Sequence, residues 1–482
     1  MTLSETAPVI SRKLGISENF FRSRTSVDFY RNFFTVATYT RPLIDDKPLL
    51  FRALRKCVLD YHILVCNVFK NSTAGYCEVL PLHNVTFGDL VDFHVHSSQP
   101  SGVSETLMAE LGETKYFELY VQKPLIKLIV TGNYDLAAVF EHTLADGVVA
   151  RLFHEILLDA LAYCDSPSND SEYSRLYGTA PSAVDADTVV FNLEADSGRL
   201  RNSLPPPAEM IMQDPVFPYC DNDPEHYSKK IPPGFSKWPG FAPSTREYKV
   251  AYKLVNIPSS ELSRILARCR EEKVSLTSYV SHVQALALQP VFGDYYTSMS
   301  ISLTLRWFLT EQKVEKPYRP ILGKKSYRML GNFAHMGVPE LMEPVYAFSW
   351  DKTRSIHANL QQSIKNDKVL SLQKNFFDNA HALEDNESFF TSQLNKRKGD
   401  SVKLSNLGYA DFPVHRIEGK EAWSIKDVVF AQHLAPAASE FVINMISSPV
   451  GGLNIVLSFY ELGHDLSKYV EDFRQQLVVN CA

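Results

Sequence analysis

The stretch EHTLADGVVA, residues 141–150, lies between two apolar segments. The segment before it, KPLIKLIVTGNYDLAAVF, contains two short β-rich runs joined by turn-forming residues, and it predicts a β-hairpin. The segment after it places apolar residues at helical spacing over residues 148–163 and predicts an amphipathic helix. His142, Asp146 and Gly147 therefore stand between a strand and a helix.

His142 has two interpretations from the residues alone. A histidine at the end of a strand lies at a sheet edge, where clefts form, and its unperturbed pKa of roughly 6.5 suits a general base. Gly147 allows close approach of another segment or a left-handed backbone angle. Alternatively, His142 is a structural histidine and Asp146 is the N-cap of the following helix. The pattern HxxxDG by itself leaves both interpretations open.

The composition indicates a globular protein. The chain has 482 residues, of which 45% are hydrophobic and 22% charged, so we expect two or three domains. The net charge of -6 and the lack of a long basic run predict no nucleic-acid partner. Seven cysteines without a CxxC pair favour reduced thiols and a cytoplasmic location. The N-terminus has no apolar core of a signal peptide, and no apolar run is long enough to predict a transmembrane helix.

Two α/β regions flank a stretch of different composition. Residues 164–247 are rich in Pro, Ser and charge, and we expect little regular structure there. Beyond this stretch, strands and helices alternate again, with a strand expected over residues 298–306 and a closing amphipathic helix within 464–479. The predicted organisation is an N-terminal half at 1–200, a crossover linker at 201–247 and a C-terminal half at 248–482.

Several familiar chemical motifs are missing from the sequence. It contains no GxxxxGK[ST], GxGxxG, GxSxG or HExxH pattern, so the usual support for ATP-driven, nicotinamide-dependent, serine-hydrolase and zincin chemistry is absent. His94 and His96 alternate as metal ligands can, but no Cys or carboxylate cluster completes a site. We therefore expect a surface strand there and no metal.

The order of several motifs along nearly the whole chain carries a resemblance. Arg12-x-x-Gly15 is followed by YRNF at residues 30–33, then by HTLADG, LTLR, LGNF and finally SNLG at residues 405–408. In this order the chain resembles the fungal alcohol acetyltransferase family, within the larger class of CoA-dependent acyltransferases that carry HxxxDG. The plant branch of that class ends with DFGWG where this chain has GYADFP, which favours the fungal branch and leaves the acceptor pocket undefined.

The resemblance implies a fold and a set of site residues. The expected fold is α/β, of the α+β type, with two similar CoA-dependent acyltransferase-like domains, mixed sheets flanked by helices, and a channel at the domain interface. His142 would be the catalytic base. Asp146 would point away from the substrate and pair with Arg306, with Gly147 beside it, all three structural at the active site. Candidates for the oxyanion donor or the channel lining are Ser405, Asn406 and His433.

The resemblance also implies an activity. His142 would deprotonate an alcohol hydroxyl that attacks acetyl-CoA as co-substrate, forming an acetate ester without a covalent acyl-enzyme. Two alternatives stay open: N-acetylation of a sphingoid base or similar lipophilic amine, and a binding or scaffold homologue without turnover. We expect a monomer that acts on a small or lipophilic alcohol or amine, and that contacts the endoplasmic reticulum or lipid droplets peripherally if it leaves the free cytoplasm.

Overall fold

The computed structural model describes most of the chain. The described residues are 8–94, 102–212, 231–322, 328–366, 368–382, 386–397, 400–436, 438–462, 464 and 466–481. His96 and Cys220 lie outside the described residues. The six cysteines inside them are free thiols.

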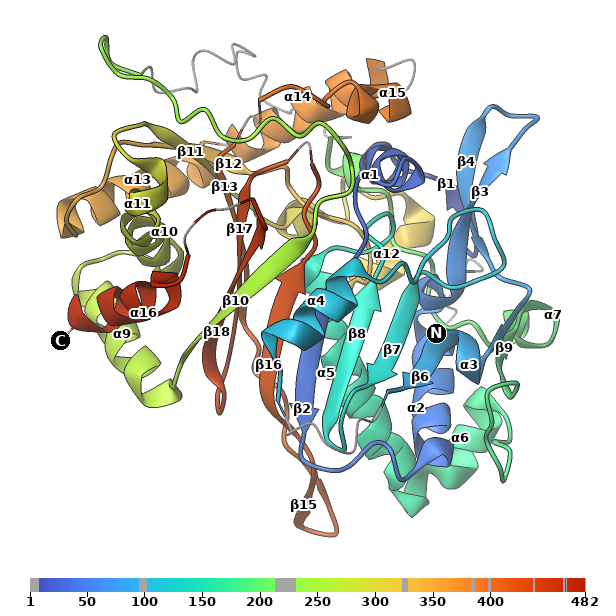
Figure 1. The fold of residues 1–482 in the computed structure, drawn as a ribbon. Coiled ribbons are helices and arrows are strands. Elements are labelled where there is room, and N and C mark those ends of the chain that lie inside the picture. Colours follow the sequence, from blue (N-terminus) through green and yellow to red (C-terminus); the bar gives the residue numbers. More distant parts are fainter. Residues whose placement is uncertain are drawn as a thin grey trace.

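Two mixed β-sheets organise the described residues (Figure 1). The N-terminal sheet has the strand order β16-β2-β8-β7-β6, in which only the β6–β7 pair is parallel. Its strands are β2 (Phe33–Tyr39), β6 (Val91–Phe93), β7 (Ile126–Val130), β8 (Asp135–Phe140) and β16 (Ile425–Gln432).

The C-terminal sheet has the order β10-β18-β17-β13-β11-β12, with β13 parallel to both β17 and β11. Its strands are β10 (Val250–Ile257), β11 (Thr297–Ile301), β12 (Val338–Met342), β13 (Val402–Tyr409), β17 (Phe441–Ser448) and β18 (Gly452–Tyr460). Three small sheets comprise β1 (Arg12–Lys13) with β4 (Tyr76–Pro81) and β3 (Cys66–Asn71), β5 (Asn84–Thr86) with β9 (Val189–Asn192), and β14 (His415–Ile417) with β15 (Lys420–Trp423).

Helices flank both large sheets. Next to the N-terminal sheet, α5 packs on β2 and β8 and against α2, whereas α4 packs on β2, β16 and β10. Next to the C-terminal sheet, α10 packs against α13 and α16. The longer helices are α1 (Ile16–Ser26), α2 (Lys47–Asp60), α4 (Glu105–Glu113), α5 (Gly147–Asp165), α6 (Asp170–Tyr177), α9 (Ser259–Glu271), α10 (Leu276–Ala287), α13 (Trp350–Lys365), α14 (Lys368–Ala382), α15 (Asn386–Thr391) and α16 (Tyr469–Val479).

Strand β16 joins the two sheets. It belongs to the C-terminal part of the sequence, yet it pairs along β2 in the N-terminal sheet. Side chains link it back to its own part of the chain: Gln432 Nε2 donates to Asn444 Oδ1 at 2.7 Å, and Asn454 Nδ2 donates to the Val428 carbonyl at 2.8 Å. The two sheets therefore meet along β16. The boundaries at 200 and 247 stay a prediction.

The fold class predicted from the sequence is confirmed: the chain has mixed sheets flanked by helices in a two-domain arrangement. The expected hairpin is β7 and β8, which pair antiparallel, and the expected helix after HxxxDG is α5. Because both rest on local periodicity, the sequence alone was enough to place them.

Two local expectations are wrong. The stretch 164–247 contains regular structure, namely α6, the strand β9 and the short helix α7 (Leu193–Asp196). Helix α6 forms because Tyr173 and Tyr177, one turn apart, are buried on one face. The strand expected over residues 298–306 ends at Ile301, since Thr304 then accepts a hydrogen bond from the Arg306 N–H and starts the short 3₁₀ helix Leu305–Phe308.

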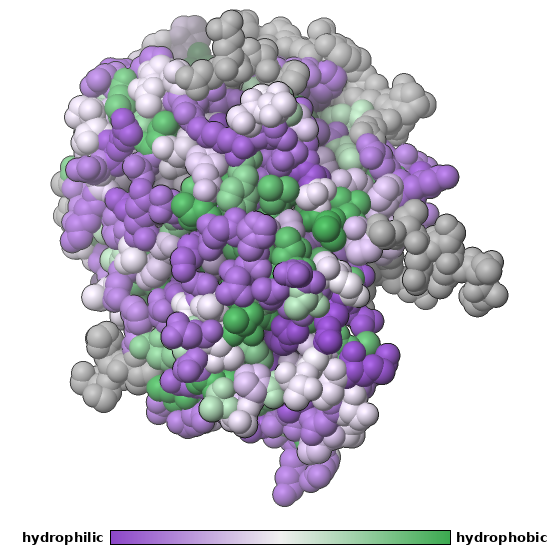
Figure 2. Space-filling view, turned by 90° about the vertical axis from the view of Figure 1, so that its right-hand side faces the viewer, coloured by the Kyte–Doolittle hydropathy of each residue, from purple (hydrophilic) through white to green (hydrophobic). Residues whose placement is uncertain are grey.

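No helix in the described ranges is long and apolar enough to cross a membrane. Figure 2 shows one face of the molecule, on which hydrophobic side chains form small patches separated by polar ones. The expected peripheral membrane contact stays a prediction.

Buried histidines make the fold sensitive to acid. Burial lowers the pKa of His62, His154 and His335 to about 4. The unfolded chain, with histidine pKa values of roughly 6.5, therefore binds more protons than the folded chain between pH 6.5 and 4. The contribution of these neutral histidines to the free energy of unfolding is fully present above the histidine pKa of the unfolded chain, and it is lost as the pH falls toward the pKa of the folded chain.

For His154 this predicts a measurable slope. In urea unfolding, the stability difference between the wild type and His154→Asn should change by about 1.4 kcal/mol per pH unit between pH 6.5 and 4, in favour of the variant at lower pH. Tyr39→Phe removes the hydroxyl that lies 3.0 Å from His154 Nδ1 but keeps the histidine, so it should retain the wild-type slope. Equal slopes for the wild type and His154→Asn would contradict the prediction.

Candidate active site

The imidazole of His142 lies in a turn directly after β8 and is half-buried. Its ring stacks on Phe21 of α1, with 4.4 Å between centroids and 7° between planes. The ring centroids of Phe33 and Tyr30 lie 5.0 Å and 5.7 Å away. The N-terminal helix and the start of β2 thus bring three aromatic rings around one histidine.

This environment keeps His142 neutral. Burial is the main cause that lowers its pKa well below the ordinary value, and the positive charges of Arg24 and Lys403 lower it further. The backbone carbonyl groups of His142 and Ala145 counteract part of the shift. At neutral pH the imidazole is therefore unprotonated and has a lone pair available to accept a proton.

Asn332 fixes the turn from the other half of the chain. Its Nδ2 donates to the carbonyl oxygen of His142 at 2.6 Å and to that of Thr143 at 3.2 Å, and it lies 3.5 Å from His142 Nδ1. The LGNF motif therefore contacts the HTLADG turn directly. Nδ1 therefore faces the segment that carries Asn332.

Asp146 has both roles that the sequence suggested. Its Oδ1 accepts from the Val149 N–H at 3.1 Å and caps α5. Its Oδ2 accepts from Arg306 Nη1 at 2.7 Å and from the Phe333 N–H at 2.8 Å. One buried carboxylate thus caps the N-terminus of α5 and joins two halves of the chain.

All three guanidinium nitrogen atoms of Arg306 donate hydrogen bonds within the protein. Its side chain is only 3% exposed, and besides Asp146 it donates to the carbonyl oxygens of Met329 at 3.0 Å and Gly331 at 2.8 Å. The guanidinium also lies 4.8 Å from the ring centroid of Phe333. Arg306 therefore holds the segment that carries Asn332.

Gly147 is required for close approach rather than for a left-handed backbone. A Cβ atom at this position would lie 2.7 Å from Cδ2 of Leu407 and 3.2 Å from Cζ of Phe430. Leu407 belongs to β13 and Phe430 to β16, so strands of both sheets contact the first residue of α5.

The SNLG segment lies within β13 and not in a plain turn. Asn406 uses its amide within the protein: Nδ2 donates to Thr277 Oγ1 at 3.0 Å, and Oδ1 accepts from the Gly408 N–H at 2.8 Å. The half-buried Ser405 hydroxyl forms no hydrogen bond among the described residues. Of Ser405 and Asn406, the two candidates for the oxyanion donor, only Ser405 has a side-chain donor that no described residue accepts.

His433 contacts Tyr30, the same ring that contacts His142. Its ring is edge-on to Tyr30 at 5.9 Å, and its Nε2 is 3.8 Å from a carboxylate oxygen of Glu113. Burial, followed by the charges of Arg31 and Arg24, lowers its pKa to about 3. His433 is therefore a neutral neighbour of the site.

Sequence reasoning missed the part that α1 has in the site. Arg12 forms a buried two-fold hydrogen-bonded ion pair with Glu18, 2.7 Å at each contact, and Glu18 also accepts from the Gly15 N–H. These contacts fix the start of the helix whose Phe21 stacks on His142. The Arg-x-x-Gly motif was visible in the sequence, but nothing in its spacing showed what α1 would contact.

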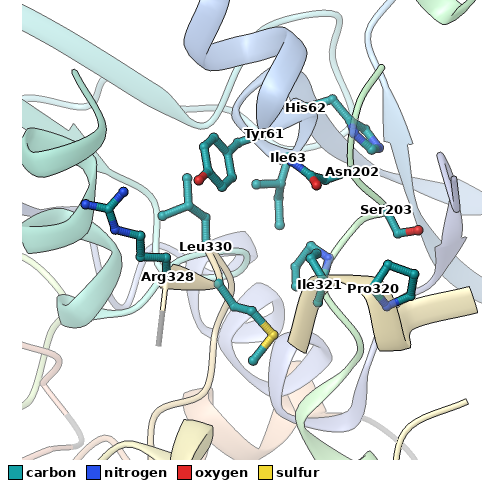
Figure 3. A pocket seen from close by; sticks show the side chains of 11 residues that line it. Tyr61, His62, Ile63, Asn202, Ser203, Pro320, Ile321, Arg328 and Leu330 are labelled. Atoms are coloured by element: carbon teal, nitrogen blue, oxygen red, sulfur yellow. The ribbon is translucent and has the colours of Figure 1, made fainter. Parts of the chain in front are cut away.

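A separate pocket lies between η1 (His62–Val65), the crossover and α12 (Arg319–Leu322) (Figure 3). It holds about 230 Å³ and is lined by Tyr61, His62, Ile63, Asn202, Ser203, Pro205, Pro320, Ile321, Arg328, Met329 and Leu330. None of the predicted site residues lines it. Within the described part of the chain, no three His, Cys, Asp or Glu side chains gather as metal ligands would.

Known proteins resemble the chain in sequence. A family model described as alcohol acetyltransferase matches residues 104–477. The N-acetyltransferase SLI1 of Saccharomyces cerevisiae is 22% identical over 478 residues, covering 93% of this chain and 95% of its own length.

Solved structures share the fold. The trichothecene 15-O-acetyltransferase TRI3 of Fusarium sporotrichioides is similar at a TM-score of 0.64 and 12% identity, over 97% of this chain and 95% of its own. The epimerization domain from the third module of tyrocidine synthetase B is similar at a TM-score of 0.59 and 12% identity, over 99% of both chains.

Removing the charge of Asp146 should destabilise the protein. In Asp146→Asn the side chain can still cap Val149, but Arg306 is left as a buried charge without its counter-ion, at a cost of about 3–5 kcal/mol in urea unfolding. Asp28→Asn is the matched control, because the Asp28–Lys115 pair is 59% exposed on both sides and its loss should cost under about 1 kcal/mol. Equal losses of unfolding free energy in the two variants would contradict the prediction, because the buried pair would then contribute no more than the exposed one.

Adding a methyl group at Gly147 should also destabilise. Gly147→Ala places Cβ against Leu407 and Phe430 and should cost about 1–3 kcal/mol. Gly198→Ala meets nothing within 4 Å and should be neutral or slightly stabilising. If Leu407→Ala recovers part of the loss in the Gly147→Ala background, the contact is the cause. A Gly147→Ala protein as stable as Gly198→Ala would contradict this.

Proposed function

Since the chain belongs to the alcohol acetyltransferase family, we propose that it transfers the acetyl group of acetyl-CoA to an alcohol hydroxyl, with His142 as general base. The observation that carries the proposal is the neutral, half-buried imidazole at the end of β8, fixed by Asn332 and stacked on Phe21. We also propose that the two halves, 1–200 and 248–482, both contribute to the site, with 201–247 as the crossover.

The proposed reaction has two proton transfers. Nε2 of His142 takes the hydroxyl proton as the acceptor oxygen bonds to the thioester carbon. When the C–S bond breaks, the imidazolium returns the proton to the CoA thiolate, so no acyl-enzyme forms. General-base catalysis typically contributes about 10²- to 10⁴-fold, and holding both substrates in line contributes further. The Ser405 hydroxyl is our candidate donor to the tetrahedral oxyanion.

An amine acceptor is the second candidate, and the resemblance to an N-acetyltransferase favours it. The same histidine serves both reactions, because a neutral amine also loses a proton after attack. The product distinguishes them: an acetate ester is hydrolysed by mild base, whereas an acetamide survives. The acceptor panel therefore comprises fatty alcohols, sterols and sphingoid bases.

The His142→Ala variant should lower thiol release from acetyl-CoA by about 10²- to 10⁴-fold with every active acceptor. The matched control is His94→Ala, since His94 is 42% exposed and lies outside the site. Circular dichroism of both variants checks that the fold is retained. Full activity of His142→Ala would contradict the general-base role, and a wild type that releases no thiol with any acceptor would favour the scaffold alternative.

A further inference from the structure

Helix α1 brings a second functional group to His142. The guanidinium carbon of Arg24, in the last turn of α1, lies 3.9 Å from the ring centroid of Tyr30 and 4.8 Å from that of Phe21. Both of these rings also contact the imidazole of His142. Arg24 is therefore separated from the proposed base by a single layer of aromatic side chains.

The guanidinium of Arg24 has donors that the protein does not use. Among the residues that the structure describes, its buried Nε and Nη2 atoms have no hydrogen-bond partner. The nearby carboxylate of Glu141 already accepts from Thr25 Oγ1 and from the Thr143 N–H at 2.6 Å, and it forms no ion pair with Arg24. Buried donors of a cation are costly when unpaired, so Arg24 is suited to an anion that the described residues do not supply.

Strand β13 contributes a second cation from the other half of the chain. Val402 and Leu404 are buried in the C-terminal core, so the alternation of the strand directs Lys403 and Ser405 to the opposite face. Ser405 is the free hydroxyl proposed for the oxyanion. Lys403 therefore lies on the face of β13 opposite the C-terminal core, two residues before that hydroxyl, and its register partner Val442 on β17 packs in the core of the N-terminal part.

The charge of Arg24 acts on Lys403. Burial lowers the pKa of Lys403, and the charge of Arg24 lowers it further, while both cations lower the pKa of His142. Asp400 is the carboxylate whose charge favours protonated Lys403, but the two side chains form no ion pair. Two like charges that face the same site repel each other when they are poorly solvated, and an anion that binds both offsets the repulsion and the lost hydration.

We propose that Arg24 and Lys403 bind a carboxylate carried by the acceptor molecule, so that the substrates of this site are hydroxy or amino acids with a lipophilic body rather than plain alcohols or simple amines. This inference rests on the proposed function. The transferred acetyl group is neutral, and the long pantetheine arm separates the thioester from the phosphates of CoA, so the acceptor is the substrate that can bring an anion to His142. A protonated amine without a carboxylate meets two cations there and is disfavoured.

Binding of the carboxylate would also raise the proton affinity of His142. Neutralising Arg24 and Lys403 removes the repulsion that opposes a proton on His142, although the effect of burial remains. The imidazole therefore becomes a stronger base once the correct acceptor is bound.

The catalytic test compares a 3-hydroxy fatty acid, whose carboxylate lies close to the reacting hydroxyl, with the matching alcohol that lacks the carboxylate, using thiol release from acetyl-CoA. The wild type should favour the hydroxy acid in kcat/KM by at least roughly tenfold, the effect of one hydrogen-bonded charge pair. Arg24→Gln and, separately, Lys403→Met should reduce this ratio about tenfold. Arg416→Gln, on an exposed side chain, should keep it. Two variants at distant sequence positions guard against the failure of one to fold.

A binding test separates this inference from the proposed function. Calorimetry with the His142→Ala protein and the hydroxy acid, without acetyl-CoA, should show binding that is about tenfold weaker when Arg24→Gln is added. If the wild type releases no thiol but this difference persists, the proposed function fails and the carboxylate site stands. No preference for the hydroxy acid over the alcohol overturns the carboxylate site. Variants that raise KM for acetyl-CoA, or that alter the use of malonyl-CoA, while leaving the acceptor ratio unchanged also overturn it, because the anion then belongs to the donor.

Discussion

The buried ion pair between Asp146 and Arg306 is the interaction on which the site depends. The carboxylate caps α5, accepts from the Phe333 N–H and binds a guanidinium that holds the carbonyl groups of residues 329 and 331. Asn332 lies within that segment and fixes the His142 turn. An ion pair of this kind adds little net stability beyond well-packed apolar residues, but removing one partner is costly. Its effect is to make the geometry around His142 possible only when both halves of the chain are in place.

The aromatic environment of His142 also depends on residues that are distant from it in sequence. Phe21, Tyr30 and Phe33 come from α1 and the segment that leads into β2, far from the HxxxDG motif in sequence. They shield the half-buried ring from much of the water and keep it neutral, which is the state a general base needs before the reaction. The pair Arg12–Glu18 fixes the helix that supplies Phe21 and Arg24. The N-terminal motif and the HxxxDG motif are therefore parts of one site.

Some elements and site residues are predictable from the sequence, and others are not. The hairpin β7–β8 and α5 follow from local periodicity, and the N-cap role of Asp146 follows from its place before an apolar helix. Arg306 was chosen as the partner of Asp146 through family resemblance, and the two side chains do lie 2.7 Å apart. Helix α6 was missed because its few buried residues stand among Ser, Asp and Glu. The strand predicted over residues 298–306 ends earlier, at Ile301. Residues with high β-propensity continue beyond it, but Thr304 turns the backbone into a 3₁₀ helix.

The sequence by itself determined the β7–β8 hairpin and α5, the HxxxDG motif and the order of motifs that carries the family resemblance. Each of these depends on residues close together in the chain or on a pattern that can be read in one dimension. Only the tertiary structure decided which groups surround His142. It also decided that Asn406 is hydrogen-bonded while Ser405 is free, and that Arg24 and Lys403 form no ion pair with any other residue that the structure describes. Whether a buried charge is paired depends on the packing of segments hundreds of residues apart, and no local pattern encodes that distance.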